Sequence, residues 1–412
     1  MSLLSIENAR ELKGTVKISG SKNAAIPIIC TSLLTDRVRL SNVPKIIDIV
    51  KLLKILNYIN VKTKWNKNNL YIDSRNIVYK PLTIEECNQI RGSYYLIPVF
   101  LYLFDKCEIV LPGGCKIGKR PIDSHLDAIS AFGYKYIIND NYLKIKKDRR
   151  INNIDYSITK KSVGASINTL VLALKAQYAV ISNLNIEPEG FAVIEFLKMM
   201  GFSISLLNNK SVIKNSTRNY SYIKYKIIPD RIEAMTFTVM GLLCGNLKIK
   251  NIDLHHMKNP LTLLIKSKYD IKLLKNSIIA KKSNGRSFDI TTEEYPGFPT
   301  DLQAIFGVLL NYSYGSSVVN EVIFENRMQI YNNLIELGSD ITLIDNKAYI
   351  NGIISTETID FKANDLRHAA ALTILALRNG GNVDNIELIE RGYEKFFSKI
   401  TKLGAKFKII TK

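Results

Sequence analysis

The segment Lys22-Asn-Ala-Ala-Ile-Pro-Ile-Ile-Cys-Thr-Ser-Leu-Leu34 is apolar on almost every side of a helix, which is typical of a helix buried in a protein core. Five similar segments follow it, and successive segments start 66 to 72 residues apart. They begin at Arg91, Val163, Arg231, Asp301 and Arg367. Self-similarity at a fixed period indicates that the chain is built from six copies of one structural repeat.

A second, amphipathic helix recurs with the same period, and each copy is followed by a glycine and a strand of alternating polarity. Such helices are expected at 122–132, 191–200, 328–337 and 393–403. The glycine is a common helix C-cap, and the alternation predicts a half-buried strand. Each repeat of about 68 residues is therefore predicted to hold one inner helix, one outer helix and several strands.

Six repeats divide naturally into two groups of three, with the seam near Pro229-Asp230. We therefore expect an α/β protein of two similar lobes, in which inner helices are surrounded by sheets and outer helices. A cleft between the lobes is the expected ligand site. The alternative is a linear solenoid, although strong solenoids usually have shorter repeats.

Composition is that of an ordinary globular protein: 412 residues, 46% of them hydrophobic and 23% charged. The first ten residues lack a basic region followed by a long apolar run, so we expect no signal peptide. The longest apolar stretch, residues 94–104, is well short of the ~20 residues that a membrane span needs. These features predict a cytoplasmic protein with no membrane association.

The net charge of +20 is large enough to suggest an anionic partner. Lys, Asn, Ile and Tyr are all abundant, however, which is the pattern that codon drift toward A and T produces across a whole chain. The densest basic run, residues 144–150, contains no interleaved aromatic residue. A solvated basic surface is therefore favoured over a nucleic-acid site.

The five cysteines are scattered, and none forms a CxxC pair or a cluster with zinc-ligand spacing. This predicts free thiols in a reducing compartment and no metal site. Four of the five stand in apolar or structural contexts, and the exception is Cys115.

Cys115 lies in the loop Leu111-Pro-Gly-Gly-Cys-Lys-Ile-Gly-Lys-Arg-Pro121, whose three glycines predict a mobile, exposed segment. Lys116, Lys119 and Arg120 would favour the thiolate form of Cys115. We interpret Cys115 as a reactive thiol. A cysteine-protease site is disfavoured because no histidine context supports a Cys–His pair.

Arginine stands out in a chain that favours lysine. Arg91, Arg231 and Arg367 each open an inner helix, and Arg120, Arg327 and Arg391 are each expected to open an outer one. Helix N-termini attract anions, and an arginine there adds a bidentate fork for phosphate or carboxylate. As a set at equivalent positions, these arginines predict a site for a small anion with several charges. The Gly/Ser turn before Lys22 is a weaker signal of the same kind.

The loop Tyr295-Pro-Gly-Phe-Pro-Thr-Asp301 is the other unusual segment. Its prolines and glycine fix the path of the chain, and Thr300 or Asp301 could cap the next helix. The functional reading of Asp301 is a general base, and the plainer reading is an acidic residue in a first helical turn.

Taken together, these segments resemble the UDP-N-acetylglucosamine 1-carboxyvinyltransferases over essentially the whole chain. The matching motifs are Gly20-Ser-Lys-Asn-Ala-Ala, the Cys115 loop, Arg120-Pro-Ile-Asp123, Ser162-Val-Gly164, Pro229-Asp-Arg-Ile-Glu233, Pro296-Gly-Phe-Pro-Thr-Asp301, Phe324-Glu-Asn-Arg327, Asp365-Leu-Arg367 and Arg391-Gly-Tyr-Glu394. The resemblance implies two inside-out α/β barrels. One would hold residues 21–229, and the other would hold 1–20 with 230–412.

The implied chemistry is transfer of the enolpyruvyl group of phosphoenolpyruvate to the 3′-hydroxyl of the nucleotide sugar, the first committed step of peptidoglycan synthesis. By matching position, Asp301 would take the hydroxyl proton. Cys115 would act as the acid near C3 and could form a covalent adduct. No cofactor, metal or protein partner is implied beyond the two small-molecule substrates.

The resemblance also implies binding residues for each substrate. Phosphoenolpyruvate would contact Lys22, Asn23, Arg120, Arg327, Arg367 and Arg391, with Lys22 and Arg391 also catalytic. The nucleotide sugar would contact Arg91, Arg120, Pro121, Ile122, Asp123, Ser124, Lys160, Lys161, Ser162, Val163, Asp301 and Ile323.

Two alternatives remain. The related shikimate 3-phosphate enolpyruvyl transferases share the six-repeat fold, although the Cys115 loop and the Lys22-Asn-Ala-Ala start argue against them. A non-catalytic repeat protein that binds RNA or another anion is the other. The sequence departs from the resemblance at Arg91-Gly-Ser-Tyr-Tyr95 and at His368, where small residues are more usual.

Overall fold

The computed structural model describes residues 2–8, 11–111, 122–207, 210–214, 221–352 and 357–411. The chain divides into two compact units. The described residues of one, here called the N-lobe, lie within 20–228, and those of the other, the C-lobe, lie within 1–19 and 229–412. Each lobe has its own hydrophobic core.

The described residues form six sheets, three in each lobe. The N-lobe sheets are β13 (Tyr222–Lys226), β3 (Arg37–Ser41), β5 (Asn69–Asp73), β4 (Lys62–Asn66); β6 (Lys106–Val110), β8 (Tyr142–Lys147), β7 (Tyr134–Asn139); and β11 (Ser203–Leu207), β12 (Lys210–Lys214), β10 (Tyr178–Ser182), β9 (Asn153–Ser157). The C-lobe sheets are β15 (Ile271–Leu274), β16 (Ser277–Lys281), β14 (Gly245–Lys250), β2 (Leu12–Lys17); β17 (Ile290–Thr291), β18 (Ser317–Asn320), β20 (Lys347–Ile350), β19 (Ile341–Ile344); and β21 (Ile359–Lys362), β22 (Gly381–Asp384), β1 (Ser2–Ile6), β23 (Phe407–Thr411).

The sheets share one pattern of strand pairing. In each four-stranded sheet, one edge strand is parallel to its neighbour and the remaining pairs are antiparallel. The three-stranded sheet keeps the pattern in reduced form, because an isolated parallel bridge joins Leu82 to Ile109 where the fourth strand would stand. Six sheets of one pattern are the structural counterpart of the six sequence repeats.

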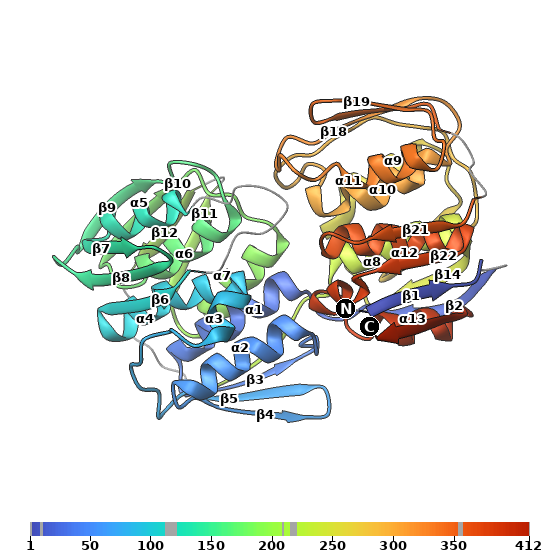
Figure 1. Cartoon of the computed structure of the whole chain (residues 1–412). Helices are drawn as coiled ribbons and strands as arrows, with labels where there is room; N and C mark the ends of the chain where they lie inside the picture. The colour runs from blue at the N-terminus through green and yellow to red at the C-terminus, as the bar shows by residue number, and fades with distance from the viewer. Residues whose placement is uncertain are drawn as a thin grey trace. The chain divides into compact units, whose positions relative to one another are not determined.

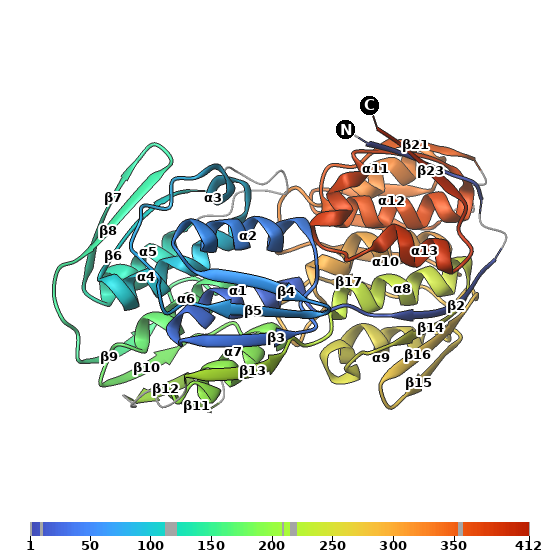
Figure 2. The ribbon, with the colours of Figure 1, turned by 90° about the horizontal axis from the view of Figure 1, so that it is seen from below.

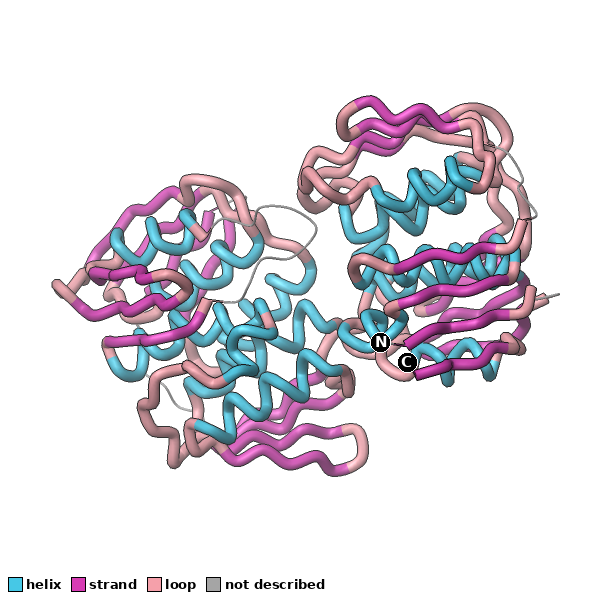
Figure 3. Tube along the Cα trace, in the orientation of Figure 1, coloured by secondary structure: helices cyan, strands magenta, loops and turns pink. Residues whose placement is uncertain are grey.

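The inner helices are buried along most of their length, as their nearly uniform apolarity predicts. In the N-lobe they are α1 (Lys22–Thr31), α4 (Leu96–Phe104) and α6 (Val163–Ala173); in the C-lobe they are α8 (Arg231–Cys244), α10 (Gln303–Asn311) and α12 (Leu366–Asn379). The three C-lobe helices pack against one another and lie side by side in Figure 2. Figure 3 shows the strands of this lobe around its helices, the inside-out arrangement.

The remaining helices are shorter or more exposed. They are α2 (Ile47–Tyr58), α3 (Glu85–Gln89), α5 (Asp123–Ala131), α7 (Pro188–Met199), α9 (Lys258–Lys266), α11 (Gln329–Glu336) and α13 (Phe396–Lys402), with 3₁₀ turns η1 (Ser32–Leu34), η2 (Arg91–Tyr95), η3 (Leu254–Met257), η4 (Thr300–Leu302) and η5 (Ile386–Arg391). The glycine after each predicted outer helix has the positive φ of a C-cap, +83° at Gly133 and +82° at Gly338.

Two strands are exchanged between the lobes. In two C-terminal repeats and one N-terminal repeat, the parallel edge strand precedes the inner helix of its own sheet in the chain: β17 precedes α10, β21 precedes α12 and β9 precedes α6. By contrast, β2 precedes α1 in the chain but pairs with β14 of the C-lobe, and β13 precedes α8 but pairs with β3 of the N-lobe. Figure 1 shows β2 beside β14. Each lobe therefore completes one sheet with a strand from the other end of its sequence.

Candidate active site

Lys22 begins α1 directly after a tight approach of two backbone segments. A Cβ added to Gly20 would lie 1.8 Å from the carbonyl oxygen of Asn42, so only glycine fits there. Ser21 caps the helix, its hydroxyl accepting from the N–H of Ala24 at 3.4 Å. The Nζ of Lys22 lies 3.2 Å from Oδ2 of Asp48. The Gly-Ser-Lys start therefore places an ammonium group at the N-terminal end of a buried helix.

The N-terminal ends of α5 and α6 meet in the N-lobe. Ser124, in the first turn of α5, donates to the carbonyl oxygen of Lys160 at 3.0 Å. Ser162 caps α6 by accepting from the N–H of Ala165 at 3.4 Å. Two of the stretches predicted to contact the nucleotide sugar, 122–124 and 160–163, are thus in direct contact.

Arg91 joins this cluster through two aromatic rings. Its guanidinium lies 5.4 Å from the ring centroid of Tyr94, and that ring is 6.0 Å from the ring of His125, which neighbours Ser124. Asn168 contacts both Tyr94 and His125, because its Nδ2 donates to the backbone oxygen of Tyr94 at 3.0 Å and lies 3.1 Å from Nδ1 of His125. His125 Nδ1 is therefore the acceptor, and burial lowers the pKa of His125 to about 4.

Asp301 is the centre of a charged cluster in the C-lobe. It lies in the 3₁₀ turn η4, where its Oδ1 is 2.7 Å from Nη2 of Arg327 and its Oδ2 is 2.7 Å from Nη2 of Arg367. Both guanidinium groups are almost fully buried. Burial opposes ionisation of Asp301, but the two arginines more than offset it and hold its pKa well below the usual aspartate value.

Neither Thr300 nor Asp301 caps the following helix, so the expected capping role is wrong. The hydroxyl of Thr300 instead donates to Oε2 of Glu321 at 2.8 Å and accepts from Nη1 of Arg327, also at 2.8 Å. The loop is held by this polar network and not by a helix end.

Arg391 does not open an outer helix as predicted. It is the last residue of η5, and α13 begins only at Phe396. Arg327 likewise precedes the first residue of α11 by two positions. The helix α13 is shorter than its apolar periodicity suggests, because Lys395 adopts a left-handed φ of +52° at its N-cap.

Three predicted site residues, Cys115, Arg120 and Pro121, lie outside the described residues. The other four cysteines are buried, as their sequence contexts predict. Among the described residues, no group of three or more His, Cys, Asp or Glu side chains is placed to hold a metal ion. In that same part of the chain, no helix is both long and apolar enough to cross a membrane.

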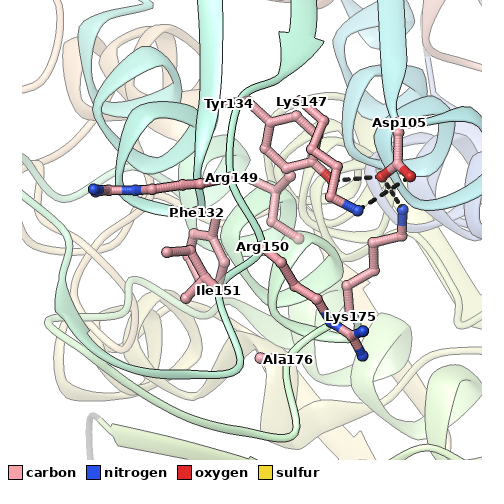
Figure 4. A pocket seen from close by; sticks show the side chains of 10 residues that line it. Asp105, Phe132, Tyr134, Lys147, Arg149, Arg150, Ile151, Lys175 and Ala176 are labelled. Atoms are coloured by element: carbon pink, nitrogen blue, oxygen red, sulfur yellow. Dashed lines mark hydrogen bonds and ion pairs between the residues drawn. The ribbon is translucent and has the colours of Figure 1, made fainter.

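The basic run 144–150 borders a cavity of about 280 Å³ in the N-lobe (Figure 4). The two lysines that line the cavity have partners. Lys147 and Lys175 both form ion pairs with Asp105, and Lys175 also donates to the Leu101 carbonyl near the end of α4. Cations that neutralise a carboxylate and bind the carbonyl groups at a helix C-terminus are structural, so Lys147 and Lys175 have a structural role at this cavity.

Comparison with known proteins identifies the family of this chain. The family model described as EPSP synthase (3-phosphoshikimate 1-carboxyvinyltransferase) matches residues 6–400. The chain belongs to the EPSP synthase family of enolpyruvyl transferases. A protein of Buchnera aphidicola subsp. Schizaphis graminum named UDP-N-acetylglucosamine 1-carboxyvinyltransferase is 36% identical over 100% of both chains. A protein of the same name from Prochlorococcus marinus (strain MIT 9515) is 38% identical over 98% of this chain and 90% of its own.

Solved enolpyruvyl transferases share the fold. The enolpyruvyl transferase NikO from Streptomyces tendae superposes with a TM-score of 0.90 at 21% identity, covering 100% of this chain and 99% of its own. An EPSP synthase from Acinetobacter baumannii superposes with a TM-score of 0.77 at 13% identity over 100% of both chains. The two-lobed α/β architecture predicted from the repeats is thereby confirmed.

Sequence reasoning missed several polar residues that build the candidate site. Glu321 stands in an apolar stretch where nothing marks it as more than a polar residue at a strand end. Asn168 carried a usable signal, because a polar amide within a helix that is apolar on nearly every side needs a partner. His125 was set aside as unable to support a catalytic cysteine, and its contact with Asn168 was not foreseen.

The burial of His368 predicts how the unfolding free energy of this enolpyruvyl transferase depends on pH. It is buried next to Arg367, with Nε2 2.7 Å from Asn333 Oδ1, and burial lowers its pKa from 6.5 to about 4. Between these values the unfolded chain binds more protons, so stability falls as the pH falls. We expect this histidine to account for about 2 kcal/mol of the loss in unfolding free energy between pH 7 and pH 5.

Urea unfolding at both pH values, compared between wild type and His368→Gln, measures this loss. The exposed His255 provides the matched control, as His255→Gln. If His368→Gln loses as much stability between pH 7 and pH 5 as the wild type does, His368 is not the responsible group.

Proposed function

We propose that this chain transfers the enolpyruvyl group of phosphoenolpyruvate to the 3′-hydroxyl of UDP-N-acetylglucosamine and releases phosphate, the first committed step of peptidoglycan synthesis. The observation that carries the proposal is identity of 36% to a protein of that name over the full length of both chains. The clustering of Asp301 with two buried arginines supplies the chemical support.

The reaction adds the acceptor and then eliminates phosphate. The acceptor oxygen forms a bond to C2 of phosphoenolpyruvate, its proton passes to Asp301, and C3 gains a proton from Cys115. The Cys115 thiolate then takes a proton back from C3, the C2–C3 double bond re-forms, and the bond between C2 and the phosphate oxygen breaks. The phosphate departs with the proton that Asp301 had taken. Lys22, Arg120 and Arg391 are proposed to hold the phosphate, with Asn23 beside Lys22.

Arg327 and Arg367 are proposed to bind the anionic substrate or intermediate, and this role bears on the basicity of Asp301. A general base works best when its pKa lies near the operating pH, whereas the two arginines hold the pKa of Asp301 well below its usual value. An incoming carboxylate or phosphate would accept hydrogen bonds from the guanidinium N–H groups that bind Asp301, and the ion pairs of Asp301 would break. Its pKa would then rise, and the base would be activated only once the anion is present.

One donor of Arg327 is available for such an anion. Its Nε is buried and has no hydrogen-bond partner among the described residues. A buried donor left unsatisfied is unfavourable by about 1–3 kcal/mol, so a ligand oxygen that satisfies it would bind favourably.

The nucleotide sugar is proposed to contact the N-lobe cluster of Arg91, Ile122 to Ser124 and Lys160 to Val163. Asp301 and Ile323 are also proposed as its contacts. The helix N-termini of α5 and α6 present free N–H groups that suit a diphosphate. Both substrates are intermediates of cytoplasmic metabolism, so we propose that the protein acts in the cytoplasm.

Phosphate release from phosphoenolpyruvate tests the proposal, with UDP-N-acetylglucosamine and shikimate 3-phosphate as parallel acceptors. We expect release only with the nucleotide sugar. Release only with the shikimate ester would keep the family and overturn the acceptor. Release with neither would overturn the activity and leave the non-catalytic alternative.

A further inference from the structure

Glu321 is a buried carboxylate at the end of β18 that accepts hydrogen bonds from four directions. Its exposed fraction is 1%. Its Oε1 accepts from the hydroxyl of Thr292 at 2.9 Å and from the N–H groups of Ile323 and Phe324 at 2.9 and 3.1 Å. Its Oε2 accepts from the hydroxyl of Thr300 at 2.8 Å. Burial of an acidic side chain in the core of a lobe is expensive unless such bonds satisfy it.

The bond from Thr300 sets the direction of a chain of hydrogen bonds. A carboxylate accepts only, so the proton of the Thr300 hydroxyl points to Glu321. The lone pairs of that hydroxyl therefore face Nη1 of Arg327, which donates to it at 2.8 Å. The Nη2 of Arg327 donates to Oδ1 of Asp301 at 2.7 Å. Glu321 thus orients Arg327 through the hydroxyl of Thr300, and Arg327 in turn orients Asp301.

A second contact reaches Arg327 by a different route. Glu321 holds the backbone N–H of Phe324, and the ring of Phe324 lies 5.2 Å from the guanidinium carbon of Arg327. An aromatic ring at this distance attracts a cation and restricts its position. The guanidinium of Arg327 is therefore located by Glu321 both through Thr300 and through Phe324.

We propose that Glu321 is a positioning residue for the transfer reaction, which it serves by fixing Arg327 and thereby Asp301 without touching a substrate. The same carboxylate fixes the backbone of Ile323, a proposed contact of the nucleotide sugar. This inference rests on the proposed function for its kinetic readout, and a readout that is independent of the acceptor accompanies it.

Glu321→Gln tests the direction of the hydrogen bonds with almost no change in shape. The amide oxygen must replace Oε1, because two backbone N–H groups need an acceptor there. The NH₂ group then faces Thr300, whose hydroxyl meets two donors, the amide and Arg327, and loses its own acceptor. We expect kcat to fall about tenfold or more, because a base held in the wrong position loses much of its catalytic contribution.

Two threonines donate hydrogen bonds to the carboxylate of Glu321, and their substitution distinguishes a positioning role from a role in stability alone. Thr300→Val removes the link to Arg327, whereas Thr292→Val removes a bond to Oε1 of Glu321 and the acceptor of the Val322 N–H, neither of which contacts Arg327. We expect Thr300→Val to lower kcat as Glu321→Gln does, Thr300→Ser to restore it, and Thr292→Val to lower only the thermal midpoint. The double variant Glu321→Gln/Thr300→Val should be no slower than either single variant, because both break one chain.

If Glu321→Gln and Thr300→Val keep the wild-type kcat while losing as much thermal stability as Thr292→Val, Glu321 is structural only and the proposal is overturned. Exchange of the Nε–H proton of Arg327 with solvent, followed by NMR in arginine-labelled protein, tests the positioning role without any acceptor substrate. It should quicken in Glu321→Gln and Thr300→Val but not in Thr292→Val. Wild-type inactivity with UDP-N-acetylglucosamine would overturn the proposed function, and unchanged exchange would overturn the positioning role.

Discussion

Asp301→Asn lowers kcat by roughly 10²- to 10⁴-fold, the usual contribution of a general base, if Asp301 takes the proton of the acceptor hydroxyl. The amide keeps the shape of the side chain but cannot accept that proton. It also leaves Arg327 and Arg367, both almost fully buried, without their shared counter-charge. Breaking a buried ion pair by removing one partner costs about 3 kcal/mol or more, so the variant should also unfold more readily.

The two effects of Asp301→Asn separate with pH. A carboxylate whose folded pKa is lowered contributes stability that is fully present above its unfolded pKa and is lost as the pH falls through the folded value. The stability difference between wild type and variant should therefore be constant near neutrality and shrink only below the ordinary aspartate value of 3.8. Urea unfolding across this range measures it.

An exposed carboxylate of the same lobe provides the control for Asp301→Asn. Among the described residues, the side chain of Asp340 accepts one surface hydrogen bond, from Asn351 at 2.9 Å, so Asp340→Asn should keep both the rate and the stability of the wild type. A folded Asp301→Asn protein that turns over within tenfold of the wild-type rate would exclude Asp301 as the base. The two arginines would then be the main functional groups of this cluster.

Fosfomycin alkylates the thiol at the position of the family loop that Cys115 occupies. We expect it to inactivate the protein completely, with one adduct per chain, on Cys115. The neighbouring Lys116, Lys119 and Arg120 favour a reactive thiolate. The other cysteines cannot compete: burial raises the pKa of Cys87 and of Cys244 to about 12.

Burial raises the pKa of Cys30 and Cys107 as well. Intact-mass measurement followed by peptide mapping identifies the labelled residue, and residual phosphate release measures inactivation. Cys115→Ser is the control, which should gain no adduct. Normal turnover after long exposure, or an adduct on a buried cysteine, would show that Cys115 is not the reactive thiol.

Local pattern predicted most of the secondary structure. The inner helices were predicted because burial on every side of a helix is visible as continuous apolarity. Two of them, α1 and α6, begin at Lys22 and Val163, where the apolar segments were expected to begin. The outer helices were placed less well, since an apolar period continues past the point where the backbone turns. Lys395 at the start of α13 shows this, because its positive φ has no sequence signature.

Candidate site residues were recognisable by type but not by their partners. Arg327 and Arg367 stood out as arginines in a lysine-rich chain, and Asp301 stood out by its proline-rich loop. Nothing in the sequence indicated that both arginines would bind Asp301 in the same structure. The role of Glu321 was equally hidden, because two of its four donors, the hydroxyls of Thr292 and Thr300, lie 29 and 21 residues away in the chain.

The sequence by itself determined the six repeats, their inner helices and the membership of the chain in an enolpyruvyl transferase fold. The repeats and the inner helices follow from periodicity, which records locally which face of each element is buried, whereas the transferase fold was implied by the resemblance of the motifs to a known family. Only the tertiary structure decided which strands complete which sheet, as β2 and β13 each pair with a lobe other than that of the next helix. It alone decided the charge pairing at Asp301, because register and long-range packing set distances that no local pattern encodes.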